Sequence, residues 1–297
     1  MTSVTLLDGG MGQELLARSG DKPTPLWSTQ VMIDHPGLVA DIHRDYFKAG
    51  ATVATTNSYA ILRDRLAAYG NEDQFHELLM AAMTEATSAR LTHGSGLIAG
   101  SIGPIKASYR PDLHPSHAEA APIYSEIATL LSPGVDLILC ESVASLTHAA
   151  SILDGAAAAG KPIWLSVTLD DNDGSKLRSG EDVKDLLPLA KGKAAALLAN
   201  CSVPEAMEAA MAIFATGGLP FGAYANGFTH ISEGFLGDAP TVDTLTARTD
   251  ITPEVYADFA LGWAGQGATI IGGCCEVGPA HIRAIHDRLT QAGYKIV

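Results

Sequence analysis

The sequence predicts a (β/α)8 barrel (TIM barrel) formed by one domain that spans residues 1–297. Eight short apolar segments alternate with helical segments along the chain. The apolar segments are continuous rather than alternating, as expected for parallel strands covered on both faces. The length of 297 residues suits such a barrel, and no low-complexity linker divides the chain. An open, doubly wound sheet is the alternative fold with the same alternation.

Each predicted strand is a short apolar run that ends at a polar or glycine-containing turn. The turns include Asp8-Gly9-Gly10 after the first run and Asn200-Cys201 after the sixth. The eight predicted strands are residues 4–7, 51–55, 96–99, 135–139, 162–169, 194–199, 219–224 and 268–271.

The predicted helices are marked by apolar residues at helical spacing and by capping residues. Ser202, with Glu205 three residues later, predicts a capping box at the start of one helix. Thr252 followed by Pro253 predicts the start of another. The predicted helices are residues 11–19, 36–48, 72–92, 116–131, 146–159, 181–187, a helix from 202, 252–263 and 279–289.

Composition argues against several classes of partner. The 19 Lys and Arg residues against 33 Asp and Glu residues give a net charge of −14, and no basic block is present. We therefore expect neither nucleic acid nor an anionic membrane as a partner.

Residues 1–10 do not have the pattern of a signal peptide, and no run approaches the ~18 apolar residues of a membrane helix. A cytoplasmic location is expected, where four cysteines indicate metal binding or catalysis rather than a disulfide framework.

Three cysteines form a candidate metal site. Cys274 and Cys275 follow two glycines after the eighth predicted strand, and Cys201 follows the sixth. In a barrel these strand ends lie on one rim, so the three thiols can converge. Three sulfur ligands suit Zn²⁺ and leave a fourth position open, as in catalytic zinc sites. The alternatives for the vicinal pair are two buried core thiols or a vicinal disulfide.

Polar residues at the same rim indicate a site for an amino acid. Glu141 closes an apolar run, where a carboxylate needs a cationic or donor partner, either a salt bridge or a substrate amine. Asp8 supplies a second carboxylate, and the N–H groups of Gly9 and Gly10 could hold a substrate carboxylate. Holders for an amine and a carboxylate beside a thiophilic metal indicate an amino acid with a sulfur side chain.

The chain resembles the homocysteine S-methyltransferase family, whose catalytic domain is a zinc barrel. The pairing of Asn200-Cys201 with Gly272-Gly273-Cys274-Cys275 is the specific part of the resemblance. The other matching segments span nearly the whole chain: Asp8-Gly9-Gly10-Met11-Gly12, Pro25-Leu26-Trp27-Ser28, His43-Arg44-Asp45-Tyr46, Ala49-Gly50-Ala51, Thr55-Thr56-Asn57-Ser58-Tyr59, Gly100-Ser101-Ile102-Gly103-Pro104, Glu141 and Tyr224-Ala225-Asn226-Gly227.

The resemblance implies a role for each matching residue. Cys201, Cys274 and Cys275 would bind zinc, and the thiolate of L-homocysteine would take the open position and attack an activated methyl group, forming methionine. Asp8 and Glu141 would hold the amino group of homocysteine. Backbone groups of Gly9, Gly10 and Thr55 would contact the substrate carboxylate, and Asn57 and Asn200 would make further contacts with the substrate. Trp27 could stack on an onium donor. Asn226 is the candidate for a fourth zinc ligand before substrate binds. His43 and its helical neighbours are interpreted as structural.

The methyl donor is expected to be small, because the chain has no cobalamin or folate module. S-methylmethionine is the first candidate, followed by S-adenosylmethionine and by betaine or another onium compound. The long loops 106–115 and 227–250 could shape the donor side or a contact within a homo-oligomer. Three alternatives stay open: a zinc hydrolase, a non-catalytic barrel that binds zinc or a thiol, and a methyltransferase with another thiol or a selenol as acceptor. Against the hydrolase, no histidine-rich motif lies at these strand ends.

Overall fold

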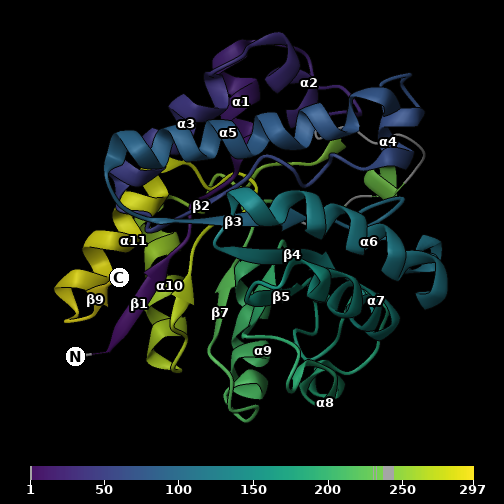
Figure 1. Cartoon of the computed structure of the whole chain (residues 1–297). Coiled ribbons are helices and arrows are strands. Elements are labelled where there is room, and N and C mark those ends of the chain that lie inside the picture. The colour runs from purple at the N-terminus through teal and green to yellow at the C-terminus, as the bar shows by residue number, and fades with distance from the viewer. Residues whose placement is uncertain (1, 230, 232, 237–243) are drawn as a thin grey trace.

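The chain forms a barrel of eight parallel strands surrounded by helices, as predicted (Figure 1). The computed structural model describes residues 2–229, 231, 233–236 and 244–297. Parts of the predicted loop 227–250 therefore lie outside the described residues. The barrel strands are β1 (Ser3–Leu6), β2 (Val53–Thr55), β3 (Leu97–Ile102), β4 (Leu137–Val143), β5 (Ile163–Val167), β6 (Ala196–Asn200), β7 (Phe221–Tyr224) and β8 (Ile270–Ile271).

The pairing of β1 closes the barrel. The strands follow one another in chain order from β2 to β8, and β8 pairs with β1. Leu7 bridges to Val53, and the N–H of Thr52 donates to Leu6 O at 2.7 Å, so β1 also joins β2. This closure excludes the open sheet that was the alternative. An additional short strand that the sequence did not predict, β9 (Lys295–Ile296), pairs with the start of β1 and brings the two chain ends together (Figure 1).

The helices form the outer layer of the barrel and agree with most of the predicted ranges. Two short helices in the loops after β1 and β2, α2 and α4, were not predicted, because neither is long enough to show helical periodicity. The helices are α1 (Met11–Ser19), α2 (Ser28–Asp34), α3 (Leu38–Ala49), α4 (Arg63–Ala67), α5 (Phe75–His93), α6 (His117–Leu131), α7 (Leu146–Ala156), α8 (Leu186–Ala190), α9 (Met207–Phe214), α10 (Pro253–Gly265) and α11 (Pro279–Gln291).

One predicted helix start is wrong and another is confirmed. The Ser202 hydroxyl donates to Leu169 O and accepts from Leu169 N–H, so it ties two loops together and does not cap a helix. The helix that follows, α9, begins only at Met207, after a 3-10 turn. By contrast, Thr252 caps α10, because its side chain accepts from the N–H of Val255.

Two apolar layers hold the barrel together. The inner layer fills the barrel with side chains from the strands and includes Leu7, Val53, Leu139, Leu198 and Ile270. The outer layer lies between the strands and the helices and contains most of the other buried apolar residues, including Cys140. Because the interior is filled, a ligand site of the barrel is expected beyond the carboxyl ends of the strands.

Gly222 on β7 is expected to be intolerant of any side chain. A Cβ atom there would lie 1.6 Å from the carbonyl oxygen of Ile270 on β8. Gly222→Ala should therefore lower the free energy of unfolding by about 3 kcal/mol, measured by denaturant titration. The matched control is Gly262→Ala on the exposed side of α10, where a Cβ meets nothing within 4 Å. That variant should be neutral or stabilised by about 1 kcal/mol, and equal effects of the two changes would contradict the prediction.

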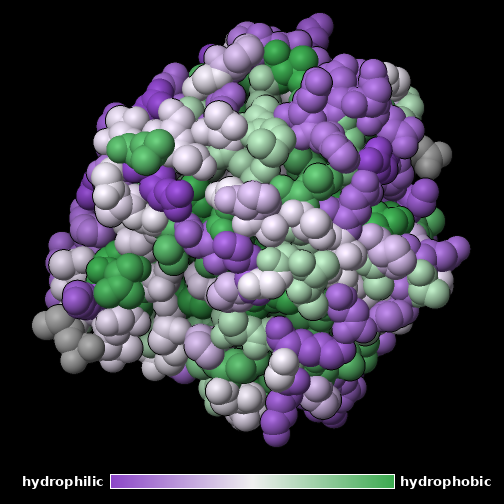
Figure 2. Space-filling view, in the orientation of Figure 1, coloured by the Kyte–Doolittle hydropathy of each residue, from purple (hydrophilic) through white to green (hydrophobic). Residues whose placement is uncertain are grey.

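None of the described helices is both long and apolar enough to cross a bilayer. On the face shown in Figure 2, apolar residues lie as separate spots among polar and weakly polar ones.

Candidate active site

A large cavity opens at the carboxyl ends of the barrel strands, where the sequence predicts the site. Its volume is about 450 Å³. It is lined by the ends of β1, β2, β3, β4, β6, β7 and β8 or the loops that follow them, and most of the predicted site residues reach it. These lining residues are Asp8, Gly9, Gly10, Trp27, Thr55, Asn57, Glu141, Asn200, Cys201, Cys274 and Cys275.

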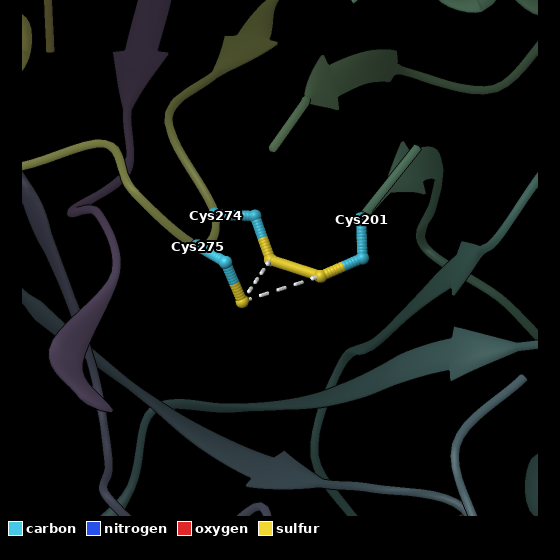
Figure 3. Close-up of side chains that lie close together, drawn as sticks. All are labelled: Cys201, Cys274 and Cys275. Atoms are coloured by element: carbon cyan, nitrogen blue, oxygen red, sulfur yellow. Dashed lines mark hydrogen bonds between the residues drawn. A yellow bond between two sulfur atoms is a disulfide. The ribbon is translucent and has the colours of Figure 1, made fainter. Parts of the chain in front are cut away.

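Three cysteine sulfurs meet in this cavity, as predicted (Figure 3). The Sγ atom of Cys275 lies 4.0 Å from that of Cys201 and 4.0 Å from that of Cys274. Cys201 and Cys274 are joined by a disulfide. Figure 3 shows Cys201 reaching across from the end of β6, whereas Cys274 and Cys275 extend from the loop after β8. The structure therefore corrects the alternative of a vicinal disulfide, since the bond joins Cys201 to Cys274.

Glycines allow the two loops behind the cysteines to come close. A Cβ atom on Gly10 would lie 2.7 Å from Cys274 O, and one on Gly9 would overlap Val277 O. The N–H of Gly10 donates to Val277 O at 2.9 Å, and the N–H of Gly273 donates to Asp8 O at 3.0 Å. The loop after β1 thus supports the cysteine loop directly and holds Asp8 beside it.

The donor set of this cluster fits a thiophilic metal. The three sulfurs lie within 4.8 Å of one another, and no carboxylate or histidine takes part in the cluster among the described residues. Metal binding requires thiolates, so the Cys201–Cys274 disulfide must first be reduced. Burial raises the pKa of the Cys275 thiol to about 12, and the nearby Glu276 charge adds to this shift. A cation would reverse the effect of burial, because it stabilises the thiolate.

Asp8 is a buried carboxylate that the neighbouring strand β2 orients. Thr55 donates to it twice, from N–H to Oδ2 at 2.7 Å and from Oγ1 to Oδ1 at 2.8 Å. Burial raises the pKa of Asp8 to about 7, and the nearby Glu141 charge adds to this, whereas the Thr55 bonds oppose it. In this structure Thr55 therefore positions Asp8, and its expected backbone contact with a substrate carboxylate stays a prediction.

Glu141 is the second buried carboxylate of the cavity. Its Oε1 accepts from the Tyr224 hydroxyl at 3.0 Å, and its Oε2 accepts from the Ser101 hydroxyl. Burial raises the pKa of Glu141, while these two hydrogen bonds oppose the shift. No cationic side chain pairs with Glu141 among the described residues, so the structural salt bridge considered for it is absent. A cationic ligand would therefore find two carboxylates without a positive partner.

Several predicted residues have structural tasks in the empty site. Asn200 accepts from Ser142 N–H and Ser166 Oγ, which ties the ends of β4, β5 and β6 together. Asn57 donates to Ser28 O, at the start of α2. The N–H of Gly10 is already bonded to Val277 O, which leaves Gly9 as the better candidate for a backbone contact with substrate.

The geometry does not support Asn226 as a metal ligand. Its Oδ1 accepts from Phe228 N–H at 3.2 Å, and the residue does not line the cavity. Its role as a fourth ligand stays a prediction.

The outer part of the cavity is rich in aromatic rings. Trp27 and Tyr59 pack edge to face with their ring centroids 6.4 Å apart, and Tyr109 packs on Phe235 at 5.9 Å. Arg65 also lines this part, and its buried Nε atom has no hydrogen-bond partner among the described residues. Such a lining can receive a small ligand that carries a cationic centre, since aromatic faces attract cations.

Unusual backbone conformations cluster around the same cavity. Positive φ is uncommon for residues other than glycine and tends to occur at functional sites. Among the described residues, five of the six such positions line the cavity, and the sixth, Glu276, directly follows Cys275. The five are Trp27, Lys106, Tyr109, Ser142 and Cys201.

Sequence reasoning assigned no role to several residues that shape the site. Tyr224 and Ser101 hold Glu141, and the Gln13 side chain lies near the Cys275 thiol. Tyr224 and Ser101 lie near the carboxyl ends of their strands, which was a usable signal. Gln13 lies on helix α1, and no pattern in the sequence marks it.

Comparisons with known proteins agree with this geometry. A sequence profile of the family described as homocysteine S-methyltransferase matches residues 5–289. A homocysteine S-methyltransferase of Escherichia coli is 32% identical, over 96% of this chain and 95% of that protein. A selenocysteine Se-methyltransferase of Brassica oleracea is 27% identical, over 96% and 89%. The crystal structure of the homocysteine methyltransferase MmuM from Escherichia coli in its metallated form superposes with a TM-score of 0.81 at 29% identity, covering 97% of this chain and 96% of that one.

Proposed function

The chain belongs to the homocysteine S-methyltransferase family, and from this premise we propose that residues 1–297 act as one homocysteine-binding domain that methylates homocysteine to methionine. One observation carries the proposal: three cysteine sulfurs lie beside two buried carboxylates in a single cavity. The cysteines would hold the metal that receives the substrate sulfur. The carboxylates would hold the substrate ammonium group.

We propose zinc as the metal. Three sulfur ligands with no oxygen or nitrogen donor in the cluster are the set that zinc binds with one position left open. Zinc bound there would lower the pKa of the substrate thiol and so supply a thiolate at neutral pH. Cys201, Cys274 and Cys275 would fix the place of this sulfur in the cavity. The metallated form of the MmuM relative supports a metal in this family fold.

Asp8 and Glu141 would orient the acceptor. Both carboxylates are buried, both line the cavity, and both are hydrogen-bonded to residues of other strands, so each has a fixed direction. An ammonium group placed between them would replace the missing positive partner and allow both to be ionised. The amino-acid end of homocysteine is thereby anchored while its sulfur stays at the cysteines.

The methyl donor would enter from the aromatic side of the cavity. The homocysteine sulfur attacks the methyl carbon of a sulfonium, a new carbon–sulfur bond forms, and the old one breaks with its electron pair left on the donor sulfur. The donor therefore leaves as a neutral thioether. The rings of Trp27, Tyr59 and Tyr109 would attract the cationic donor, and Arg65 offers a guanidinium for a donor carboxylate. These features support S-methylmethionine as the first candidate.

The test combines metal analysis with donor selection. Reduced, purified protein is expected to carry about one zinc per chain. It should form methionine when homocysteine is offered with S-methylmethionine, and less or none with S-adenosylmethionine or betaine. Zinc without methyl transfer from any donor would refute the proposed reaction. Absence of zinc in the reduced protein would refute the proposed site.

The acceptor could also be a selenol. The Brassica relative is a selenocysteine Se-methyltransferase, and a selenolate binds the same thiophilic site. Offering homocysteine and selenocysteine at equal concentration decides between them. A higher kcat/KM for selenocysteine would favour this second function.

Binding of the amino-acid end is expected to weaken in acid. Burial raises the pKa of Asp8 to about 7, and only the ionised carboxylate attracts an ammonium group. Affinity should therefore be constant above this pH and fall by up to about tenfold per unit below it. Calorimetry with methionine, which has no thiol to titrate, measures this between about pH 5.5 and 8.5. Asp8→Asn should abolish the dependence, and a wild-type affinity that is independent of pH would contradict the assignment.

A further inference from the structure

His43 on α3 is a buried histidine with no hydrogen-bond partner. Its exposed fraction is 0%, and neither Nδ1 nor Nε2 is hydrogen-bonded to any of the described residues. Buried polar atoms are nearly always paired, because an unpaired one has lost its hydrogen bonds to water without a replacement. A histidine that serves only as packing would leave this cost without compensation.

A carboxylate of the active site lies near this ring. Nδ1 of His43 lies 3.8 Å from Oδ2 of Asp8. His43 itself does not line the cavity, so it lies behind Asp8 on the side away from the substrate. Tyr46, one helical turn further along α3, donates to Val277 O in the cysteine loop. The same face of α3 therefore supports both halves of the site.

We propose that His43 is a positioning residue, whose Nδ1–H donates to Oδ2 of Asp8 whenever this carboxylate is ionised, as it is when the substrate ammonium group is bound. This inference rests on the proposed function, in which Asp8 holds that ammonium. Thr55 already donates once to each oxygen of Asp8. A third donor from His43 fixes Oδ2 from behind and leaves the outward lone pairs of the carboxylate for the substrate.

A separation of 3.8 Å between these two atoms fits a protonated Asp8. A pKa of about 7, caused mainly by burial, leaves Asp8 partly protonated at neutral pH. A neutral acid group attracts a third donor weakly. Once the ammonium group binds, Asp8 is fully ionised, and a shift of about 1 Å brings Nδ1 within the usual hydrogen-bond distance of Oδ2.

His43 acts as a neutral donor in this arrangement. Burial lowers its pKa to about 3, so it carries no charge at neutral pH. Among the described residues, the titratable groups that act on Asp8 are Glu141 on β4 and His43 and Tyr46 on α3. Because Glu141 and Tyr46 are unchanged in a His43 variant, a shift in the titration of Asp8 reports the loss of the His43 donor.

The test compares three His43 variants by the pH dependence of methionine binding. His43→Leu removes the donor, so the pH midpoint of binding should rise by about one unit, and affinity near pH 6 should fall about tenfold. His43→Asn places an amide N–H near the position of Nδ1 and should restore the wild-type midpoint. His43→Gln places it near Nε2 and should behave like the leucine variant. In turnover, KM for homocysteine should rise in His43→Leu while kcat and zinc content stay unchanged.

The outcomes separate this inference from the function on which it rests. A folded, zinc-loaded His43→Leu protein with the wild-type midpoint would overturn the role of His43 alone. Equal pH midpoints for the Asn and Gln variants would also overturn the role of His43. This comparison can be made even when the leucine variant does not fold. Nitrogen NMR of the wild type must place the ring proton on Nδ1, and a proton on Nε2 would overturn the role as well. Failure of the wild type to bind methionine or homocysteine would overturn both the inference and the proposed function.

Discussion

Cys201→Ala is expected to remove the bound metal and the methyltransferase activity together. Two thiolates would remain, from Cys274 and Cys275, and both come from the same loop. Structural zinc sites gain about 10–16 kcal/mol from four ligands, so the loss of one should weaken metal binding by at least about 100-fold. Competition with a chromophoric chelator measures this affinity, and methionine formation measures the activity.

The fourth cysteine provides the matched control. Cys140 is fully buried in the outer apolar layer, and its thiol takes no part in the sulfur cluster. Cys140→Ala should lose some stability, about 1 kcal/mol for a small cavity, but keep its metal and its turnover. Full metal retention with normal turnover in Cys201→Ala would refute the metal site.

The cysteine cluster was predictable from the sequence because, in a barrel, the order of the strands determines where their ends lie. Cys201 and Cys274 are 73 residues apart, yet each directly follows the predicted end of a strand or its glycine turn. Parallel strands in one closed barrel place all such ends on the same rim. The same argument placed Asp8 and Glu141, which also come at strand ends. Once the fold is predicted, the shared position of these cysteines and carboxylates follows from it.

The supporting contacts were not predictable in the same way. His43 lies in the middle of a helix, where a buried histidine and a packing residue have the same spacing in sequence. Its approach to Asp8 depends on how α3 packs against β1 and β2, which no local pattern encodes. Helices α2 and α4 were missed for a related reason. Short helices are stabilised by tertiary contacts rather than by their own periodicity.

Glu141→Gln is expected to weaken homocysteine binding while the metal stays in place. The amide keeps the shape of the side chain but removes the charge that would attract the ammonium group. A hydrogen bond to a charged group contributes about 1.5–3 kcal/mol, so Kd and KM for homocysteine should rise roughly 10- to 100-fold. Glu141 bonds to Ser101 and Tyr224 and to no cysteine, so zinc content should not change.

The stability of this variant provides an independent check of the same assignment. Burial raises the pKa of Glu141 above its value in the unfolded chain. The contribution of Glu141 to stability is therefore fully present below the unfolded pKa. It is lost as the pH rises through the pKa of the folded protein. At neutral pH the neutral amide should therefore melt at the same temperature as the wild type or higher. Glu205→Gln, at a half-exposed ion pair with Arg248, is the control and should leave both binding and zinc unchanged. A Glu141→Gln protein that loses zinc or melts early would make Glu141 a structural residue, because binding of an ammonium group contributes nothing to the ligand-free fold.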